Sequence, residues 1–176
     1  MKCYLCSKSA KIKQQKGRAI CDDCFVRLIE KRIRKYTRLN KIFKPEDKIL
    51  IKGDLSKYFV ESITKDLPVK IFSNKNKKSN KIAIDWTADD EANLFLEELF
   101  LGKKAKVEKR YIRLLRVITD KEAELFSKIK KLKFKRNKKN KDIQKLIDDM
   151  EKKDPGAKYR LLKNFDMLNR LTLKVK

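Results

Sequence analysis

The sequence predicts an α/β protein in which a short cysteine-rich ribbon precedes a small parallel sheet and a group of C-terminal helices. Three observations predict this class. Four cysteines fall in two close pairs near the N-terminus, short apolar runs alternate with helical stretches after residue 45, and helical spacing alone continues to the end. Strands that alternate with helices are typical of a parallel sheet covered on both faces.

The composition indicates the class of partner. The chain has 176 residues, and 49 Lys and Arg against 24 Asp and Glu give a net charge of +25. A field of this sign favours a polyanion such as nucleic acid, with a solvated Lys-rich surface as the alternative. Histidine is absent, which excludes Ser-His and Cys-His catalysis.

Export and membrane insertion are not predicted. The sequence contains no apolar run of about 18 residues, and no charged start followed by an apolar stretch and a small-residue cleavage site. We therefore expect a soluble, cytoplasmic protein.

The four cysteines predict one structural zinc ion. Two residues separate Cys3 from Cys6 and Cys21 from Cys24, and 14 residues lie between the pairs. Each pair can sit on a tight turn that brings two thiolates together, and two turns complete a tetrahedral shell. Two alternatives stay open. An iron–sulfur cluster also takes four thiolates, usually at other spacings, and redox chemistry would need only one of the pairs.

The chain divides into four predicted segments. They are a zinc ribbon at 1–24, a basic linker helix at 25–44, a reduced α/β domain at 45–127, and a basic loop with C-terminal helices at 128–176.

Short apolar runs in the third segment predict strands at 48–52, 67–73, 81–85 and 110–117, with a polar loop at 74–80. The first strand leads through Gly53 to Ser56 and a helix, which is the layout of a phosphate-binding turn. Thr87 and Thr119 each precede a helical pattern and are expected to cap it.

Two basic surfaces are expected to contact RNA phosphates. One is the polar face of the linker helix, with Arg32, Arg34, Lys35 and Arg38. The other is the stretch Lys128–Lys145, which has ten Lys or Arg against one acid and is typical of a mobile nucleic-acid-binding loop. Its expected RNA contacts are Lys130, Lys131, Lys133, Lys135, Arg136, Lys138 and Lys139.

Several collinear pieces of the chain resemble one family. They are the two cysteine pairs followed by Phe25, then 48–56, 81–92, 113–122 and 154–159. Together they resemble the tRNA 2-thiouridine synthetases of the PP-loop ATP-pyrophosphatase superfamily, which include TtuA-type enzymes and cytosolic wobble-uridine thiolases. The most specific piece is Asp89-Asp90-Glu91-Ala92, which matches the family's Leu-Asp-Asp-Glu-Ala motif.

The resemblance implies a PP-loop-like fold of the adenine nucleotide alpha hydrolase type, with tRNA as ligand. It also implies ATP with Mg²⁺ at Gly53, Ser56, Asp89 and Asp90. The departures from the family's pattern are equally specific. The family's loop reads Ser-Gly-Gly-Lys-Asp-Ser, whereas this chain has Ile-Lys-Gly-Asp-Leu-Ser at 51–56.

One glycine of the family's loop is therefore lost, and Asp54 places a carboxylate where phosphate would rest. No cysteine follows Cys24 to hold an iron–sulfur cluster or to handle sulfur. The connection from Ser56 to Lys81 is much shorter than in the family, and the family's second zinc finger is absent. The active enzymes adenylate a uridine carbonyl and then deliver sulfur to it, and this chain lacks parts needed for both steps.

These departures predict a non-catalytic, tRNA-binding subunit of a uridine 2-thiolation complex, with no catalytic residue of its own. Its partner would be a full-length catalytic PP-loop thiolase or a second copy of itself. Two alternatives stay open. One is a minimal ATP-dependent tRNA sulfurtransferase with Mg²⁺ at Asp89 and Asp90, although carboxylates are common at a helix N-terminus anyway. The other is a stand-alone zinc-ribbon RNA-binding protein.

Overall fold

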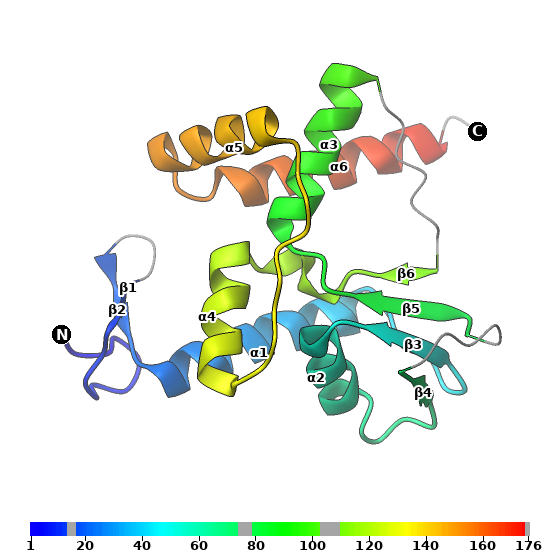
Figure 1. Ribbon diagram of the computed structural model, residues 1–176, viewed down its shortest axis with the longest axis horizontal. Coiled ribbons are helices and arrows are strands. Elements are labelled where there is room, and N and C mark those ends of the chain that lie inside the picture. The colour runs from blue at the N-terminus through cyan, green and yellow to red at the C-terminus, as the bar shows by residue number, and fades with distance from the viewer. Residues whose placement is uncertain (14–16, 74–78, 103–109, 175–176) are drawn as a thin grey trace.

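The computed structural model describes residues 1–13, 17–73, 79–102 and 110–174, so the loop predicted at 74–80 falls mostly outside the described residues. Figure 1 shows the arrangement of the elements. The strands are β1 (Ile12–Lys13), β2 (Ala19–Ile20), β3 (Lys48–Lys52), β4 (Lys70–Phe72), β5 (Lys81–Ile84) and β6 (Tyr111–Ile112). The helices are α1 (Asp22–Leu39), α2 (Asp54–Ile63), α3 (Ala88–Leu101), the 3-10 helix η2 (Leu114–Val117), α4 (Asp120–Lys130), α5 (Lys141–Lys153) and α6 (Ala157–Lys174).

The central sheet is parallel throughout and has the order β4-β3-β5-β6. In its register Ile51 lies opposite Ala83, and Ala83 lies opposite Ile112, so these three side chains share one face. Leu50 and Ile82 point to the opposite face and are buried as well. The predicted α/β class with a parallel sheet is confirmed.

The strand predicted at 110–117 is wrong over most of its length. Only Tyr111–Ile112 pairs with β5, and the chain then turns into η2. Leu114 and Leu115 are fully buried in the same apolar cluster as α1. This short apolar run therefore fills the core instead of extending the sheet. Periodicity alone does not distinguish a short buried strand from a short buried helical turn.

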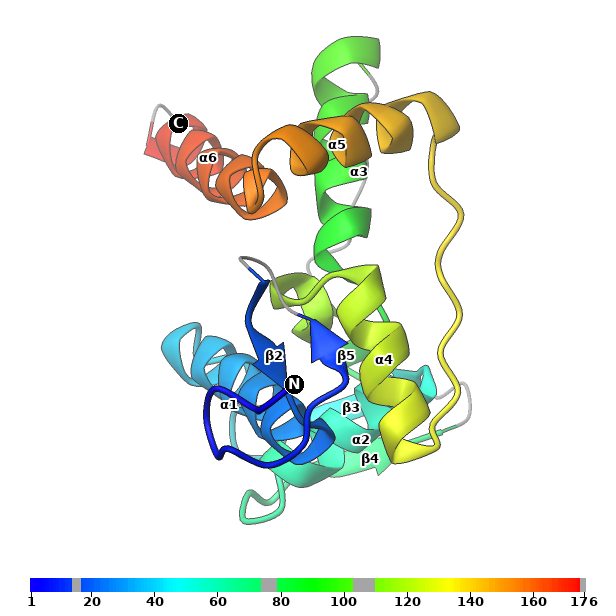
Figure 2. The ribbon, with the colours of Figure 1, turned by 90° about the vertical axis from the view of Figure 1, so that its left-hand side faces the viewer.

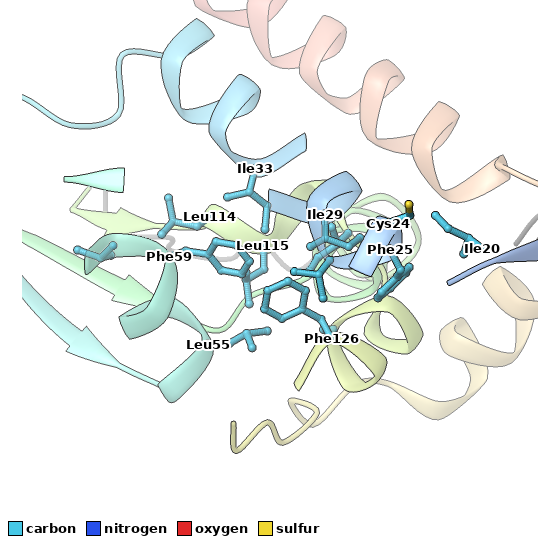
Figure 3. Packing of buried hydrophobic residues seen from close by; sticks show 14 of the residues in the cluster. Ile20, Cys24, Phe25, Ile29, Ile33, Leu55, Phe59, Leu114, Leu115 and Phe126 are labelled. Carbon is cyan, nitrogen blue, oxygen red and sulfur yellow. The ribbon is translucent and has the colours of Figure 1, made fainter. Parts of the chain in front are cut away.

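One apolar cluster joins the ribbon, one sheet face and the helices α1, α2 and α4. Phe25 and Ile29 of α1, Leu55 and Phe59 of α2, and Phe126 of α4 are fully buried in it (Figure 3). The ring centroids of Phe59 and Phe126 lie 5.1 Å apart. The three helices therefore share one core with that face of the sheet.

A second apolar cluster holds α3, α5 and α6 together. It contains Phe95 of α3, Ile143 and Ile147 of α5, and Leu162 of α6. The rings of Phe95 and Phe165 are 4.8 Å apart at the crossing of α3 and α6. Figures 1 and 2 show this helical lobe on one side of the sheet-containing lobe, with an extended segment connecting α4 to α5.

The buried residues group the segments differently from the predicted boundaries. Cys3, Cys21 and Cys24 belong to the cluster that includes the sheet, so the ribbon shares its core with the α/β part. Helix α3, predicted within 45–127, packs with the helices of 128–176. The four-segment division therefore stays a prediction about the chain, while packing divides it into two lobes.

Both predicted capping positions start a helix. The Thr87 hydroxyl accepts from the Asp90 N–H while the Asp90 carboxylate accepts from the Thr87 N–H, and Thr119 and Glu122 repeat this arrangement. Helix α3 ends at Gly102, whose φ of 62° suits glycine. Among the helices that the structure describes, none has the length and apolar character needed to cross a bilayer.

Removal of the Phe126 ring tests the role of the first cluster. Because Phe126 has 0% exposure, we expect Phe126→Ala to lower the free energy of unfolding by about 3–5 kcal/mol in chemical denaturation. The control Leu39→Ala removes a side chain that is 67% exposed and should change stability by less than about 0.5 kcal/mol. Equal losses for the two variants would contradict this assignment of the core.

Candidate metal centre, phosphate turn and basic surfaces

The four cysteine thiols converge at the start of the chain. Cys3 and Cys6 lie on a tight turn in which the Ser7 N–H donates to the Cys3 carbonyl at 2.9 Å. Cys21 and Cys24 flank the first residues of α1. The antiparallel pair β1 and β2 connects the two turns and brings them together.

Their geometry suits a single tetrahedral ion. The four Sγ atoms lie within 4.8 Å of one another, and those of Cys6 and Cys21 are 3.5 Å apart. With Zn–S bonds of about 2.3 Å, a tetrahedral shell holds its sulfurs a little under about 4 Å apart. A four-iron cluster attaches each thiolate to a different iron and needs a wider spacing. The four cysteines therefore form a candidate metal site whose size fits one ion.

The thiols of Cys3 and Cys24 differ in how readily they ionise. Burial raises the pKa of the Cys3 thiol, but hydrogen bonds from the backbone of Cys21, Leu5 and Cys6 outweigh it and lower that pKa to about 6. The hydrogen bond with Cys6, together with burial, raises the pKa of Cys24 to about 12. One thiolate thus forms readily and another does not, and a divalent cation would allow all four to ionise.

The turn between β3 and α2 contains a carboxylate from another strand. The Ser56 N–H, in the first turn of α2, donates to Asp85 Oδ1 at 2.7 Å. Asp85 directly follows β5, which is the neighbour of β3 in the sheet. Gly53 precedes α2 with a φ of 126°, and a Cβ there would lie 2.4 Å from the Asp85 carboxylate. Only glycine permits this close approach.

Asp85 therefore lies where the start of α2 would otherwise receive an anion. Free N–H groups and the helix dipole favour negative charge at this position. Burial raises the pKa of Asp85, while hydrogen bonds from Ser56 and Leu55 oppose that rise. Sequence reasoning had singled out Asp54, which is exposed, and missed Asp85. The signal was available, because Asp85 ends the strand beside the predicted phosphate turn.

Gly53 and Ser56 thus lie together at this turn, whereas Asp89 and Asp90 lie in a buried ionic network. Asp89 accepts from Lys158 Nζ at 2.6 Å and from the Asp120 N–H at 2.8 Å. Asp90 pairs with Lys139 Nζ at 2.6 Å in addition to its role in the helix cap.

Lysines therefore neutralise both carboxylates of the Asp-Asp pair. Burial opposes the charge of Lys139, but its bonds to Asp90 and Asp120 raise its pKa overall. The same balance raises the pKa of Lys158. A magnesium ion would have to displace these two lysines, and the nucleotide role of Asp89 and Asp90 stays a prediction.

The cations of α1 separate into two groups. Arg32 turns toward the core, where its Nη1 donates to Glu122 Oε1 at 2.9 Å and to the Tyr159 hydroxyl at 3.2 Å. The other predicted RNA contacts on α1 are exposed and lie along a groove of about 460 Å³. They are Arg34, Lys35 and Arg38, with Arg27 and Lys31 beside them.

The basic stretch after α4 is extended, and its cations are partly engaged. Arg136 donates to Glu124 Oε1 at 2.5 Å and to Oε2 at 2.7 Å. Asn137 donates to the Asp85 carbonyl at 2.7 Å and to Asp90 Oδ2 at 2.9 Å. Acids on α3 and α4 thus bind two side chains of this segment, and its mobility stays a prediction.

The remaining predicted RNA contacts of this stretch differ in their surroundings. Lys130 lies 3.7 Å from Glu30 and 5.2 Å from the centre of the Tyr58 ring. Four further predicted contacts are exposed, namely Lys131, Lys133, Lys135 and Lys138. These four, rather than Lys130, Arg136 and Lys139, are placed to meet a phosphate.

A cavity of about 790 Å³ opens beside Asp85 at the carboxyl ends of the strands. Its lining includes the aromatic residues Trp86, Tyr111 and Phe134, and the Arg113 guanidinium stacks 5.1 Å from the centre of the Trp86 ring. Ligands of open parallel sheets bind at this edge, and the volume is sufficient for a small molecule. One end of the cavity is the turn between β3 and α2, which the Asp85 carboxylate occupies.

The fold, an α/β arrangement around a parallel sheet, is similar to that of a solved tRNA thiolase. Among solved structures, the chain is similar to the U34-tRNA thiolase NcsA from Methanococcus maripaludis, which was described with its [4Fe-4S] cluster. The TM-score is 0.71 at 19% identity, over 96% of this chain and 87% of that one, so the likeness concerns the fold alone. No protein-family model and no curated protein sequence matches the chain.

Substitution of one ligand tests the metal centre. We expect Cys24→Ser to lose bound metal and to lower the melting temperature by about 5 °C or more, because a structural metal contributes folding free energy directly. Elemental analysis and thermal unfolding measure the two effects. The control Ser9→Ala changes an exposed side chain of the same ribbon and should alter neither. Unchanged metal content in Cys24→Ser would rule out the four-cysteine site.

The carboxylate in the turn is tested with inorganic pyrophosphate as the probe. We expect Asp85→Ala to bind pyrophosphate about tenfold more tightly than the wild type, since it removes the charge that lies against the Ser56 N–H. The control Asp54→Ala removes the same charge from the same turn, but from an exposed side chain. Calorimetry that shows equal gains for both variants would contradict a specific role of Asp85.

Proposed function

We propose that the chain is a non-catalytic, tRNA-binding subunit in tRNA uridine 2-thiolation. One observation carries the proposal: Asp85 accepts a hydrogen bond of 2.7 Å from the Ser56 N–H, in the turn that corresponds to the PP-loop. A thiolase that adenylates uridine needs this turn for the phosphates of ATP. A fixed internal carboxylate there repels them, so the fold is retained without its phosphate site.

Binding of tRNA is supported by the fold and by the distribution of charge. The chain carries a net charge of +25, and exposed cations lie along α1 and at Lys131, Lys133, Lys135 and Lys138. Contacts between such cations and phosphates release counterions and provide affinity without base recognition. A catalytic PP-loop thiolase, or a second copy of this chain, would complete the complex in the cytoplasm.

Zinc is the ion that we propose for the ribbon. Four thiolates that converge on one point match its tetrahedral preference and its affinity for sulfur. The chain has four cysteines in all, so a [4Fe-4S] cluster such as that of NcsA would have to take these same ligands. When bound, zinc would fix the two turns to each other and stabilise the start of α1.

The cavity beside Asp85 favours a second candidate function, a minimal ATP-dependent thiolation enzyme. Its volume of about 790 Å³ and its aromatic lining suit an adenosine. Gly53 and Ser56 would then hold phosphate, with magnesium at Asp89 and Asp90. Against this candidate stand the Asp85 carboxylate and the lysines that neutralise both aspartates. A stand-alone RNA-binding protein would share the tRNA affinity but need no protein partner.

Three assays on the purified wild-type chain distinguish these functions. We expect it to bind tRNA with an affinity that falls steeply as salt rises, because phosphate contacts dominate. We also expect no heat on titration with Mg-ATP at millimolar concentration, and no thiolation of tRNA by the chain alone. ATP-dependent thiolation by the isolated chain would contradict the proposal.

Purification of the tagged chain from its native cell then separates a subunit from a stand-alone binder. Recovery of tRNA together with a full-length PP-loop thiolase supports the subunit. Recovery of RNA with no protein partner supports the stand-alone protein.

A further inference from the structure

Five cations form one row on the exposed face of α1, which we call the α1 row. Arg27, Lys31, Arg34 and Arg38 recur at intervals of four, three and four residues, and Lys35 lies beside them. This spacing places them on a single side of the helix, along roughly 16 Å of its axis. The opposite side of α1 is fixed in the core by Phe25, Ile29 and Ile33. The row is therefore a rigid surface.

The charge of the α1 row is uncompensated. Among the described residues that line its groove, the single acid is Glu30. Lys130 lies 3.7 Å from Glu30, and the Tyr58 hydroxyl donates to Glu30 Oε1 at 2.5 Å. This carboxylate is thus already engaged from α2 and α4, and the cations of the row remain available to an external anion.

The α1 row also lacks a surface on which a base could stack. Tyr36 is the only aromatic residue in the second half of α1, and it is turned away, half-buried next to Arg116. Proteins that hold single-stranded RNA combine cations with exposed aromatic rings. Double-stranded RNA, in contrast, is recognised by shape and through phosphates and 2′-hydroxyls. Since the apolar side of α1 is buried, the row is equally unsuited to a membrane surface.

We propose that the α1 row binds the backbone of an A-form RNA stem. The inference rests on the proposed tRNA-binding function. It assigns binding of the base-paired stems of tRNA to the α1 row. Helix α1 is held in place by the core, so its five cations start from fixed backbone positions. The phosphates of an RNA duplex also have fixed positions, and the two sets can therefore match without reordering the RNA. Exposed Lys133 and Lys135, which line the aromatic cavity, are left for unpaired nucleotides.

A triple variant tests the α1 row. The variant Arg27→Ala/Arg34→Ala/Arg38→Ala removes three charges from it, and Lys65→Ala/Lys153→Ala/Lys163→Ala removes three exposed charges outside both basic surfaces as the matched control. The probes are tRNA, a short RNA hairpin that is mostly duplex, a polyuridine with the same number of phosphates, and a polyglutamate peptide. Fluorescence anisotropy at several salt concentrations gives the affinities.

We expect the row variant to bind the hairpin about tenfold or more weakly than the control variant does. The slope of its log–log salt dependence should be smaller by about one for each phosphate that the variant no longer neutralises. For polyuridine, the two variants should agree within about twofold. Circular dichroism and thermal unfolding confirm that both variants are folded.

The outcomes separate the inference from the function on which it rests. If the two variants bind the hairpin equally well while the wild type binds tRNA, the proposed role of the α1 row is contradicted and the proposed function is not. An equal loss for polyuridine, or wild-type binding of polyglutamate as tight as of the hairpin, shows a general anion surface and also contradicts it. A wild type that binds neither tRNA nor the hairpin contradicts the proposed function.

Discussion

The buried ionic network at the start of α3 is the interaction on which the rest of the structure depends. Asp89 pairs with Lys158 of α6, and Asp90 pairs with Lys139 of the extended segment, each at 2.6 Å. The Asp120 N–H at the start of α4 also donates to Asp89, and the Asp120 carboxylate pairs with Lys139. Through Asp120 the network joins the helical lobe and the segment after α4 to the sheet-containing lobe. Loss of one partner from such a pair leaves an uncompensated buried charge and costs about 3–5 kcal/mol. The acidic motif thus serves the architecture of the chain.

The network is also linked by hydrogen bonds to the turn between β3 and α2. Asn137 belongs to the segment that Lys139 anchors, and it donates both to Asp90 and to the backbone carbonyl of Asp85. The Asp85 side chain in turn accepts from the Ser56 N–H at the start of α2. A carboxylate from the neighbouring strand therefore occupies the turn between β3 and α2. Exposed cations lie along α1 and on the segment after α4, away from this buried network.

The sequence predicted those features that depend on residues close together along the chain. The spacing of Cys3, Cys6, Cys21 and Cys24 indicated the metal site, and threonine caps indicated the starts of α3 and α4. Features that depend on register or packing were missed. Asp85 meets Ser56 only because β3 and β5 are neighbours, and Arg32 leaves the basic face because Glu122 lies beside it. A charge run does not reveal which of its members already have partners.

A crystal structure of the wild-type protein soaked with Mg-ATP tests the central claim most directly. The account predicts that the Asp85 carboxylate still accepts from the Ser56 N–H and that no phosphate density lies at the start of α2. The contrary result would be a phosphate bound to the Ser56 N–H, with the Asp85 side chain rotated away and magnesium between Asp89 and Asp90. That result would identify the chain as an ATP-binding thiolase in place of a non-catalytic subunit.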